Sequence, residues 1–259
     1  MTNGVKEFPI LRINRESRQE IKDKLAQEYA FTIILNNQEL VTLLCSPMNL
    51  KYLAVGFLFS EGFVKNKEEV KKMTLNEQRG VAYMETSETI EPARDLFKRL
   101  ITSSCGRGVT FYSTADAQSA ARVSSRMKIS ANEVFALINE FQLRSRIYRE
   151  TGGVHGSALC DTKNILVFSE DIGRHNAIDK VFGECILKNI SVADRIIITS
   201  GRISSEALLK VVRRNISIVA SISAATDMAV NLAADLGVTL IGFVRGRRMN
   251  VYTNSWRVS

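Results

Sequence analysis

The second half of the chain alternates short apolar stretches with amphipathic ones, and this alternation restricts the folds open to it. Five stretches have the length and apolar content of buried strands: residues 155–161 and 165–169, and the segments RIIITS, ISIVAS and VTLIGFV. Apolar residues at helical spacing occupy the intervals 174–188, 205–214 and 226–236. Strands that alternate with helices of this length predict an α/β fold whose sheet carries helices on both faces.

The first half predicts a smaller α+β unit. Residues 30–45 predict two strands joined at Asn36 and Asn37, because asparagine tolerates the left-handed backbone of a tight hairpin. A helix should follow, with Ser46 as its N-cap and Pro47 in its first turn.

The boundary between the two halves is expected where the composition changes. Residues 102–128 are rich in Ser, Thr, Gly and Ala and predict an exposed, mobile loop. A helix capped by Ser130 should then open the second half. We therefore expect two domains, at residues 1–128 and 129–259.

Composition and charge exclude several classes of protein. The chain has 259 residues, 45% of them hydrophobic and 24% charged, which is typical of a folded protein. No run approaches the ~20 apolar residues of a membrane span, and the N-terminal residues lack the apolar core of a secretory signal. We therefore expect a cytoplasmic protein with no membrane partner. The net charge of +8 favours an anionic partner, but no basic platform with interleaved aromatics indicates nucleic acid.

The unusual residues of the chain fall where predicted strands run into predicted helices. Residues 170–176, 200–206 and 221–226 occupy three such junctions, and residues 242–248 follow the last strand. Ligands collect at such junctions because unpaired backbone N–H groups there attract anions. Five arginines lie in these segments and predict a phosphate or pyrophosphate site: Arg174, Arg202, Arg245, Arg247 and Arg248. Neither a P-loop nor a dinucleotide glycine motif is present.

Cys105 is the candidate reactive residue among four widely spaced cysteines. Small residues flank it, and the neighbouring Arg107 would favour its thiolate form, which suits nucleophilic attack or sulfur carriage. An incidental loop cysteine is the alternative interpretation. The other three cysteines lie in apolar stretches and should be structural: Cys45, Cys160 and Cys185. His155 and His175 stand in polar, glycine-flanked settings and are candidate functional groups.

These motifs together resemble the FdhD family of formate dehydrogenase accessory sulfurtransferases. The matching stretches, in chain order, are residues 37–45, 54–62, 102–106, 151–155, 170–180, 200–206 and 242–246. The resemblance implies a cytidine-deaminase-like three-layer mixed sheet with a smaller N-terminal α+β domain, assembled as a homodimer. The family often carries a second cysteine where this chain has Gly108, so this loop lacks a resolving thiol.

The resemblance also implies an activity and its partners. Members accept sulfur from a cysteine desulfurase and pass it to the molybdenum cofactor, bis-molybdopterin guanine dinucleotide, before it enters formate dehydrogenase. Cys105 matches the persulfide-carrying cysteine. Phe243, Val244, Arg245, Gly246, Arg247 and Arg248 match the cofactor-binding stretch, and Arg174, His175, Arg202 and His155 are expected to line the same site. No resident metal is expected.

Two other functions compete with sulfur carriage. A zinc deaminase would need H-x-E and a later P-C-x-x-C, and the sequence has neither. A chaperone that binds the cofactor without moving sulfur is compatible with the sequence, and Gly108 makes it more plausible.

Overall fold

The structure, a computed structural model, describes residues 4–87 and 122–259. Within these ranges the strands are β1 (Val5–Ile13), β2 (Arg18–Ala26), β3 (Tyr29–Leu35), β4 (Gln38–Cys45), β5 (Val70–Asn76), β6 (Val81–Thr86), β7 (His155–Cys160), β8 (Ile165–Asp171), β9 (Ile196–Thr199), β10 (Ile218–Ser221), β11 (Thr239–Arg245) and β12 (Arg248–Val251). The α-helices are α1 (Leu50–Ser60), α3 (Ala131–Arg144), α4 (Arg146–Thr151), α5 (Arg174–Leu187), α6 (Ser205–Val212) and α7 (Asp227–Asp235).

A mixed six-stranded sheet forms the centre of the second half. Its order is β12-β11-β10-β9-β7-β8. Strands β9, β10 and β11 are parallel, whereas β7 runs antiparallel to both β8 and β9. Strand β12 turns back antiparallel to β11. Consequently β8, β9, β10 and β11 all end at the same edge of the sheet, and β7 and β12 begin there.

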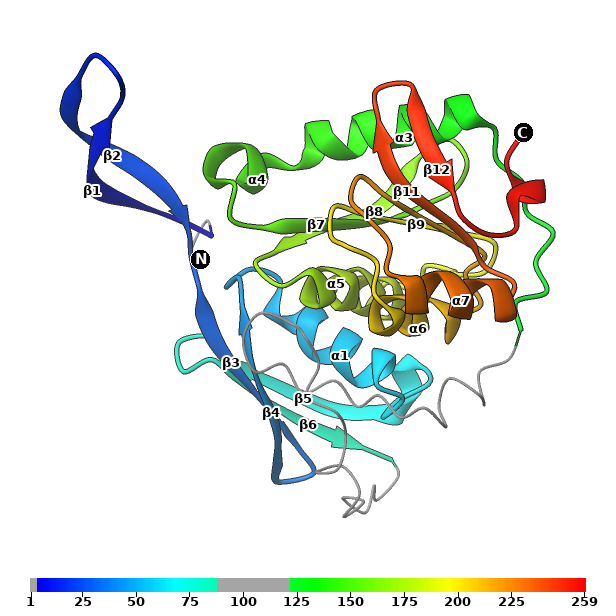
Figure 1. The fold of residues 1–259 in the computed structure, drawn as a ribbon. Helices are drawn as coiled ribbons and strands as arrows, with labels where there is room; N and C mark the ends of the chain where they lie inside the picture. The colour runs from blue at the N-terminus through cyan, green and yellow to red at the C-terminus, as the bar shows by residue number, and fades with distance from the viewer. Residues whose placement is uncertain (1–3, 88–121) are drawn as a thin grey trace.

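Helices cover both faces of this sheet, as the sequence predicts (Figure 1). Successive residues of β9 alternate between two buried clusters, because neighbouring side chains of a strand point to opposite faces. Ile196 and Ile198 pack with α3, whereas Ile197 packs on the side of α5, α6 and α7. Beyond α5 lie α1 and a second sheet of order β4-β3-β6-β5.

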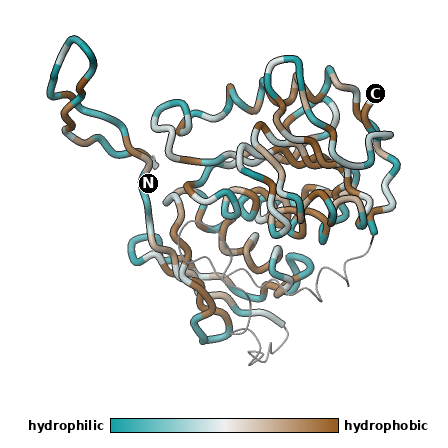
Figure 2. The backbone as a smooth tube through the Cα atoms, in the orientation of Figure 1, coloured by the Kyte–Doolittle hydropathy of each residue, from teal (hydrophilic) through white to brown (hydrophobic). Residues whose placement is uncertain are grey.

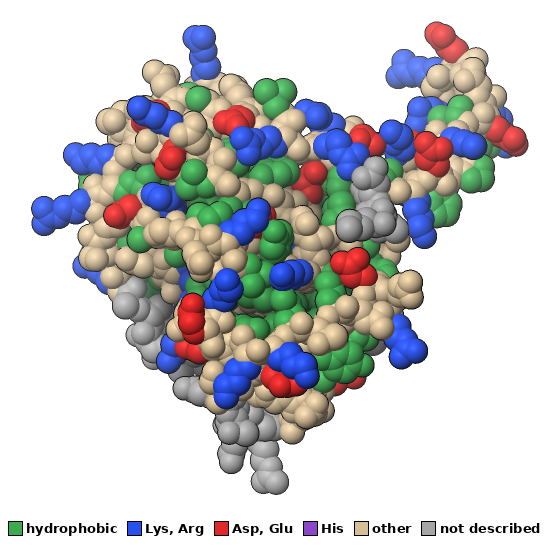
Figure 3. Space-filling view, turned by 180° about the vertical axis from the view of Figure 1, so that it is seen from behind, with side chains coloured by type: hydrophobic (Ala, Val, Ile, Leu, Met, Phe, Trp, Pro, Cys, Tyr) green, Lys and Arg blue, Asp and Glu red, His purple; other side chains and the backbone are tan. Residues whose placement is uncertain are grey.

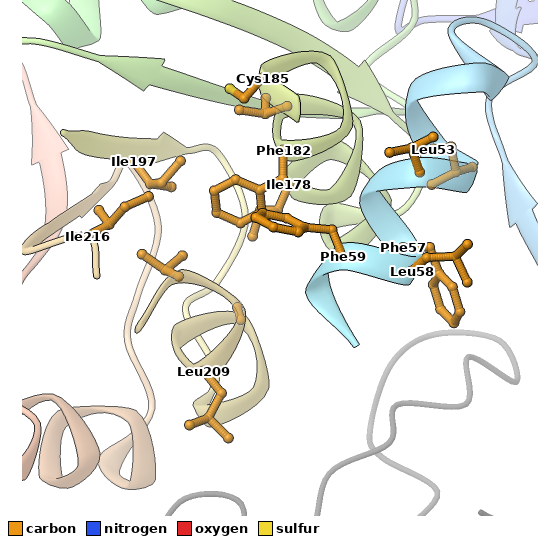
Figure 4. Packing of buried hydrophobic residues seen from close by; sticks show 14 of the residues in the cluster. Leu53, Phe57, Leu58, Phe59, Ile178, Phe182, Cys185, Ile197, Leu209 and Ile216 are labelled. Carbon is orange, nitrogen blue, oxygen red and sulfur yellow. The ribbon is translucent and has the colours of Figure 1, made fainter. Parts of the chain in front are cut away.

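Helices α1 and α5 are in backbone contact, and two glycines make this possible. A Cβ atom on Gly56 would lie 1.7 Å from the carbonyl oxygen of Asp179, and one on Gly183 would lie 1.9 Å from that of Tyr52. Beside this crossing, Phe59 and Phe182 meet edge to face at 6.3 Å (Figure 4). Helix α1 is thereby fixed to the second half of the chain.

One hydrophobic cluster joins the two halves of the described chain. It contains Phe31 and Met84 from the smaller sheet, Leu53 from α1, and Ile197 and Leu240 from the larger sheet. The division at residue 128 therefore stays a prediction, since apolar packing is continuous across it. Most of the predicted loop at 102–128 lies outside the described residues, and within 122–128 Val123 is buried.

Local predictions for turns and caps had mixed outcomes. Asn36 and Asn37 have φ of 48° and 66° and join β3 to β4, as predicted. Ser130 and Glu133 form a reciprocal capping box at the start of α3, which confirms that prediction. The predictions for Ser46 and Pro47 were wrong: Asn49 is the N-cap residue of α1, so both residues precede the helix. Ser46 is instead used in a buried polar cluster described below.

The N-terminal hairpin, which the sequence analysis missed, is a two-stranded arm formed by β1 and β2. It pairs with no other strand of the described chain and projects away from the body (Figure 1). Hydrophobic and hydrophilic residues are mixed along it (Figure 2). Its base is attached to α4: Lys24 Nζ lies 3.0 Å from Glu150 Oε2, and Gly153 leaves room for Ala26.

The α1–α5 contact predicts a strong effect of one methyl group. We expect Gly56→Ala to lower the free energy of unfolding by about 3 kcal/mol or more, because the rigid backbone of α5 cannot yield. Gly62→Ala is the control: its Cβ meets nothing within 4 Å, and only its φ of 84° opposes alanine. It should cost about 1–2 kcal/mol. Urea unfolding measures both values, and a Gly56→Ala cost no larger than the control would contradict this packing.

Candidate functional site

The candidate site lies at the sheet edge where β8, β9, β10 and β11 end. His155 opens β7 and pairs with Asp171, the last residue of β8. Arg174 packs on Gly201 of the β9–α6 turn, where a Cβ would lie 2.8 Å from that of Arg174. Arg245 Nε donates to the carbonyl oxygen of Ile222, 3.1 Å away, in the β10–α7 turn. The junctions that the sequence predicts to converge are therefore adjacent.

A buried ion pair holds the β8–α5 turn beneath this edge. Lys180 Nζ lies 2.6 Å from Asp171 Oδ2, and both side chains are fully buried. The backbone N–H of Ser46 donates to the same oxygen at 3.0 Å, and Lys180 donates to the Ser46 carbonyl at 3.1 Å. The N–H of Ile172 in turn donates to Ser46 Oγ. These contacts lock the start of α5 onto the β4–α1 connection.

Several polar residues of the predicted site are scaffold rather than ligand-facing groups. Both carboxylate oxygens of Glu170 accept backbone N–H groups at the start of α4. Asn176 donates to the Leu44 carbonyl oxygen and to Asp171. Ser200 Oγ accepts from the N–H of Gly156 at 2.9 Å, and Ser221 Oγ donates to the Gly201 carbonyl at 2.8 Å. These bonds tie neighbouring strand ends together.

His175 lies at the start of α5 against α6. Its Nε2 is 3.4 Å from Glu206 Oε2, a contact that does not meet hydrogen-bond geometry. Burial, followed by the charges of Lys210 and Arg174, holds the pKa of His175 well below its usual value, so the ring is neutral. One turn further along both helices, Lys210 Nζ lies 2.7 Å from Asp179 Oδ2. Burial raises the pKa of Asp179 to about 6 despite this partner.

His155 lies closer to the strand ends than His175. Its Nδ1 is 3.5 Å from Ser200 Oγ, which bridges it to the β9–α6 turn. Burial and the charge of Arg174 lower the pKa of His155, and Asp171 opposes this shift. The imidazole can therefore act near neutral pH as an uncharged donor or acceptor.

The positive charge of the edge is concentrated in its exposed arginines. Arg202, Arg245, Arg247 and Arg248 are exposed, and Arg174 is half-buried. Gly246 and Arg247 form the two-residue turn between β11 and β12, with Gly246 at φ 60°. The Arg245 guanidinium stands 5.6 Å from the centre of the Phe243 ring. Val244 is 1% exposed and packs in the core, so it contributes to the position of the strand end and not to the exposed surface.

Helix α5 offers backbone N–H groups toward the same edge. Its N-cap residue is Gly173, which has no side chain to cap the first N–H groups of the helix. The side chains of Ser204 and Thr226, in contrast, cap α6 and α7. The N-terminus of a helix favours negative charge, and Arg174 adjoins this one. The edge can thus hold a phosphate-bearing ligand by backbone and guanidinium groups together.

The cysteines divide into three buried residues and Cys105. Cys45 and Cys160 are fully buried and Cys185 is 1% exposed, which confirms the structural role predicted for them. Burial raises the pKa of each of these thiols to about 12. They are therefore neutral, inaccessible thiols at physiological pH. Cys105 and Arg107 lie outside the described residues.

An apolar cavity of about 520 Å³ opens beside the edge, between α3, α4 and the strand ends. Phe141, Leu143 and Tyr148 line one side, and Gly156 and Ser200 line the other. Gly156 is necessary here because a Cβ would lie 2.8 Å from the Phe141 ring. The sequence analysis did not predict this cavity, since its walls come from separate segments.

Sequence reasoning also missed Glu206 and Lys180 as members of the site region. Both lie within motifs that were singled out. The sequence does not show that Lys180 pairs with Asp171 and the Ser46 carbonyl, or that Glu206 lies against His175. Within residues 4–87 and 122–259, no cluster of His, Cys, Asp and Glu could hold a metal ion. The helices of these ranges are also too short or too polar to cross a membrane.

The geometry defines an α/β protein with an arginine-lined sheet edge, and comparisons with known proteins show its family. The model of the FdhD/NarQ family matches residues 26–259. The chain therefore belongs to the FdhD/NarQ family, which confirms the resemblance seen in the sequence.

Named relatives cover the whole chain. The sulfur carrier protein FdhD of Bacillus pumilus (strain SAFR-032) is 42% identical over 261 residues, which is 100% of both chains. That of Bacillus subtilis (strain 168) is 42% identical over 96% of this chain and 95% of the relative. The crystal structure of a putative formate dehydrogenase accessory protein from Desulfotalea psychrophila superposes with a TM-score of 0.81 at 26% identity, covering 98% of this chain and 99% of that one.

The burial of the two histidines predicts the order in which they titrate. As the pH falls below 7, His155 should become protonated before His175, and both below the usual value of 6.5. The unfolded chain would take up these protons first, so both rings should lower the free energy of unfolding as the pH falls through 6.5. Long-range ¹H–¹⁵N spectra measure this, with His155→Asn to assign the signals. A His175 ring that titrates near 6.5 would contradict its burial.

Proposed function

We propose that this protein is a sulfur carrier that holds a persulfide on Cys105 and delivers the sulfur to a molybdenum cofactor for formate dehydrogenase. The observation that carries this proposal is the burial of the other three cysteines. With Cys45, Cys160 and Cys185 enclosed and their pKa values raised to about 12, Cys105 is the remaining thiol of four for this chemistry.

Loading of Cys105 is a thiol exchange that needs one thiolate on this chain. The Cys105 thiolate attacks the terminal sulfur of a persulfide on a cysteine desulfurase. A sulfur–sulfur bond forms on Cys105 as the donor bond breaks, and the donor cysteine leaves as a thiolate. The nearby Arg107 favours the attacking thiolate by its charge. No second cysteine is required, so Gly108 is compatible with carriage.

The sheet edge is the proposed binding site for the cofactor that receives the sulfur. Bis-molybdopterin guanine dinucleotide carries pyrophosphate groups, which suit Arg174, Arg202, Arg245, Arg247 and Arg248. Phe243 offers a ring beside Arg245, and neutral His155 can accept or donate a hydrogen bond without adding charge. The exposed backbone turn at Gly246 leaves room for close approach.

We further propose the partners, assembly and location of this protein. A cysteine desulfurase donates the sulfur, formate dehydrogenase is the enzyme served, and the protein is a homodimer in the cytoplasm. The names of the relatives support sulfur carriage, and that of the structural neighbour supports the accessory role. For the fold, the mixed sheet between helical layers supports the more specific description as cytidine-deaminase-like.

A cofactor chaperone that moves no sulfur is the second candidate. The arginine-lined edge favours it as much as it favours a carrier, because both must bind the cofactor. The two differ at Cys105, which a chaperone does not need.

Sulfur loading distinguishes these two functions directly. After incubation with a cysteine desulfurase and cysteine, we expect one added sulfur atom on Cys105, located by intact-mass and peptide mass spectrometry. Cys105→Ala should show no added sulfur. Cys185→Ala is the matched control and should still be loaded on Cys105. An active desulfurase that leaves Cys105 unmodified would favour the chaperone.

The proposed phosphate contacts can be tested with guanosine diphosphate. We expect Arg245→Glu to weaken its binding about tenfold or more in titration calorimetry, as for the loss of a charge-assisted hydrogen bond. Arg79→Glu, an exposed position in the β5–β6 turn, makes the same change of charge away from the sheet edge. Equal weakening in both variants would mean that net charge alone, and not this edge, attracts the ligand.

A further inference from the structure

The N-terminal arm exposes apolar side chains that no other described part of the chain covers. Phe8, Leu11, Ile13 and Leu25 are 45%, 43%, 65% and 43% exposed. Seen from behind, the arm shows hydrophobic side chains between charged groups (Figure 3). An isolated two-stranded hairpin is marginally stable in water, so this arm gains much from a surface that covers it.

The cavity between α3 and α4 offers a mainly apolar surface. Leu143 and Tyr148 at its walls are 70% and 49% exposed. Of the described residues that line it, Arg149 is the charged one. Helix α4 carries Tyr148 and Arg149 into this cavity and also anchors the arm through Glu150, so the arm begins beside the cavity of its own chain.

We propose that the arm is exchanged between two copies of this chain, each inserting its tip into the cavity between α3 and α4 of the other. A two-fold axis near α4 uses each contact twice, and it covers the cavity together with the face of the arm that carries Leu11 and Ile13. Phe8 and Leu25 lie on the opposite face of the arm. Because Gly156, Ser200 and Ile222 line the cavity, the inserted arm of the second copy also walls the candidate site. Of the proposed function, this inference uses the homodimer alone, so it does not depend on sulfur carriage.

Charge indicates which face of the arm is inserted. Cross-strand partners point to the same face, so Leu11 shares a face with Glu20, and Ile13 shares it with Arg18. Ala26 and Lys24, which contact the α4 region at the base, belong to that face as well. Among described residues, neither Glu20 nor Arg149 has an ion-pair partner. Insertion of Leu11 therefore brings the Glu20 carboxylate to the Arg149 guanidinium.

The mass of the full-length protein in solution tests this exchange. By size-exclusion chromatography with light scattering, we expect a dimer for the wild type and a monomer for Leu11→Asp/Ile13→Asp. Tyr83→Asp changes an apolar side chain of similar exposure on β6 and should remain a dimer. A monomeric wild type, or a double variant that is still a dimer, would overturn the proposal.

A charge exchange tests the docking site without removing apolar contacts. Glu20→Arg and Arg149→Glu alone should each raise the dissociation constant of the dimer about tenfold or more. The combined variant Glu20→Arg/Arg149→Glu should return it toward the wild-type value. Additive weakening in the combined variant would overturn the pairing of the arm with this cavity. None of these measurements depends on sulfur loading.

Discussion

The buried ion pair between Asp171 and Lys180 is the interaction on which the rest of the structure depends. Both groups are removed from water, which costs desolvation free energy. Hydrogen bonds to Ser46 offset this cost: its N–H donates to Asp171, and its carbonyl oxygen accepts from Lys180. This arrangement joins the end of β8 and the start of α5 to the connection between β4 and α1. It therefore fixes at once the α1–α5 crossing and the orientation of the α5 N-terminus. Loss of either charge would leave the other buried and unpaired.

In the site region, the buried charges are paired with one another, whereas the charges at the surface are those of arginines. Beneath the edge, Asp171 pairs with Lys180, Asp179 and Glu61 share Lys210, and His175 is kept neutral. The charge available to a ligand is consequently that of the exposed arginines. The thiols are divided in the same way, since burial makes three of them unreactive. A carrier needs this division, because sulfur loaded on several cysteines could not be delivered from one place.

The sequence predicted the layered α/β fold because strand and helix periods differ clearly in residues 155–245. It predicted the sheet edge for the same reason, since parallel strands must end together. It failed at Ser46, whose hydroxyl looks like a helix cap until its partner Ile172, distant in sequence, is known. It failed at the arm, where mixed charged and apolar residues predict no burial, and at the cavity, whose walls meet only in three dimensions. Motif residues such as Asp171 and Asn176 looked functional but hold the scaffold.

The most direct test of sulfur carriage by Cys105 is maturation of formate dehydrogenase in cells that lack their own accessory protein. The account predicts that the wild-type chain restores formate oxidation, whereas Cys105→Ala does not, although it accumulates to the same level and still binds guanosine diphosphate. Restoration of activity by Cys105→Ala would contradict sulfur carriage and leave cofactor binding as the function of this edge.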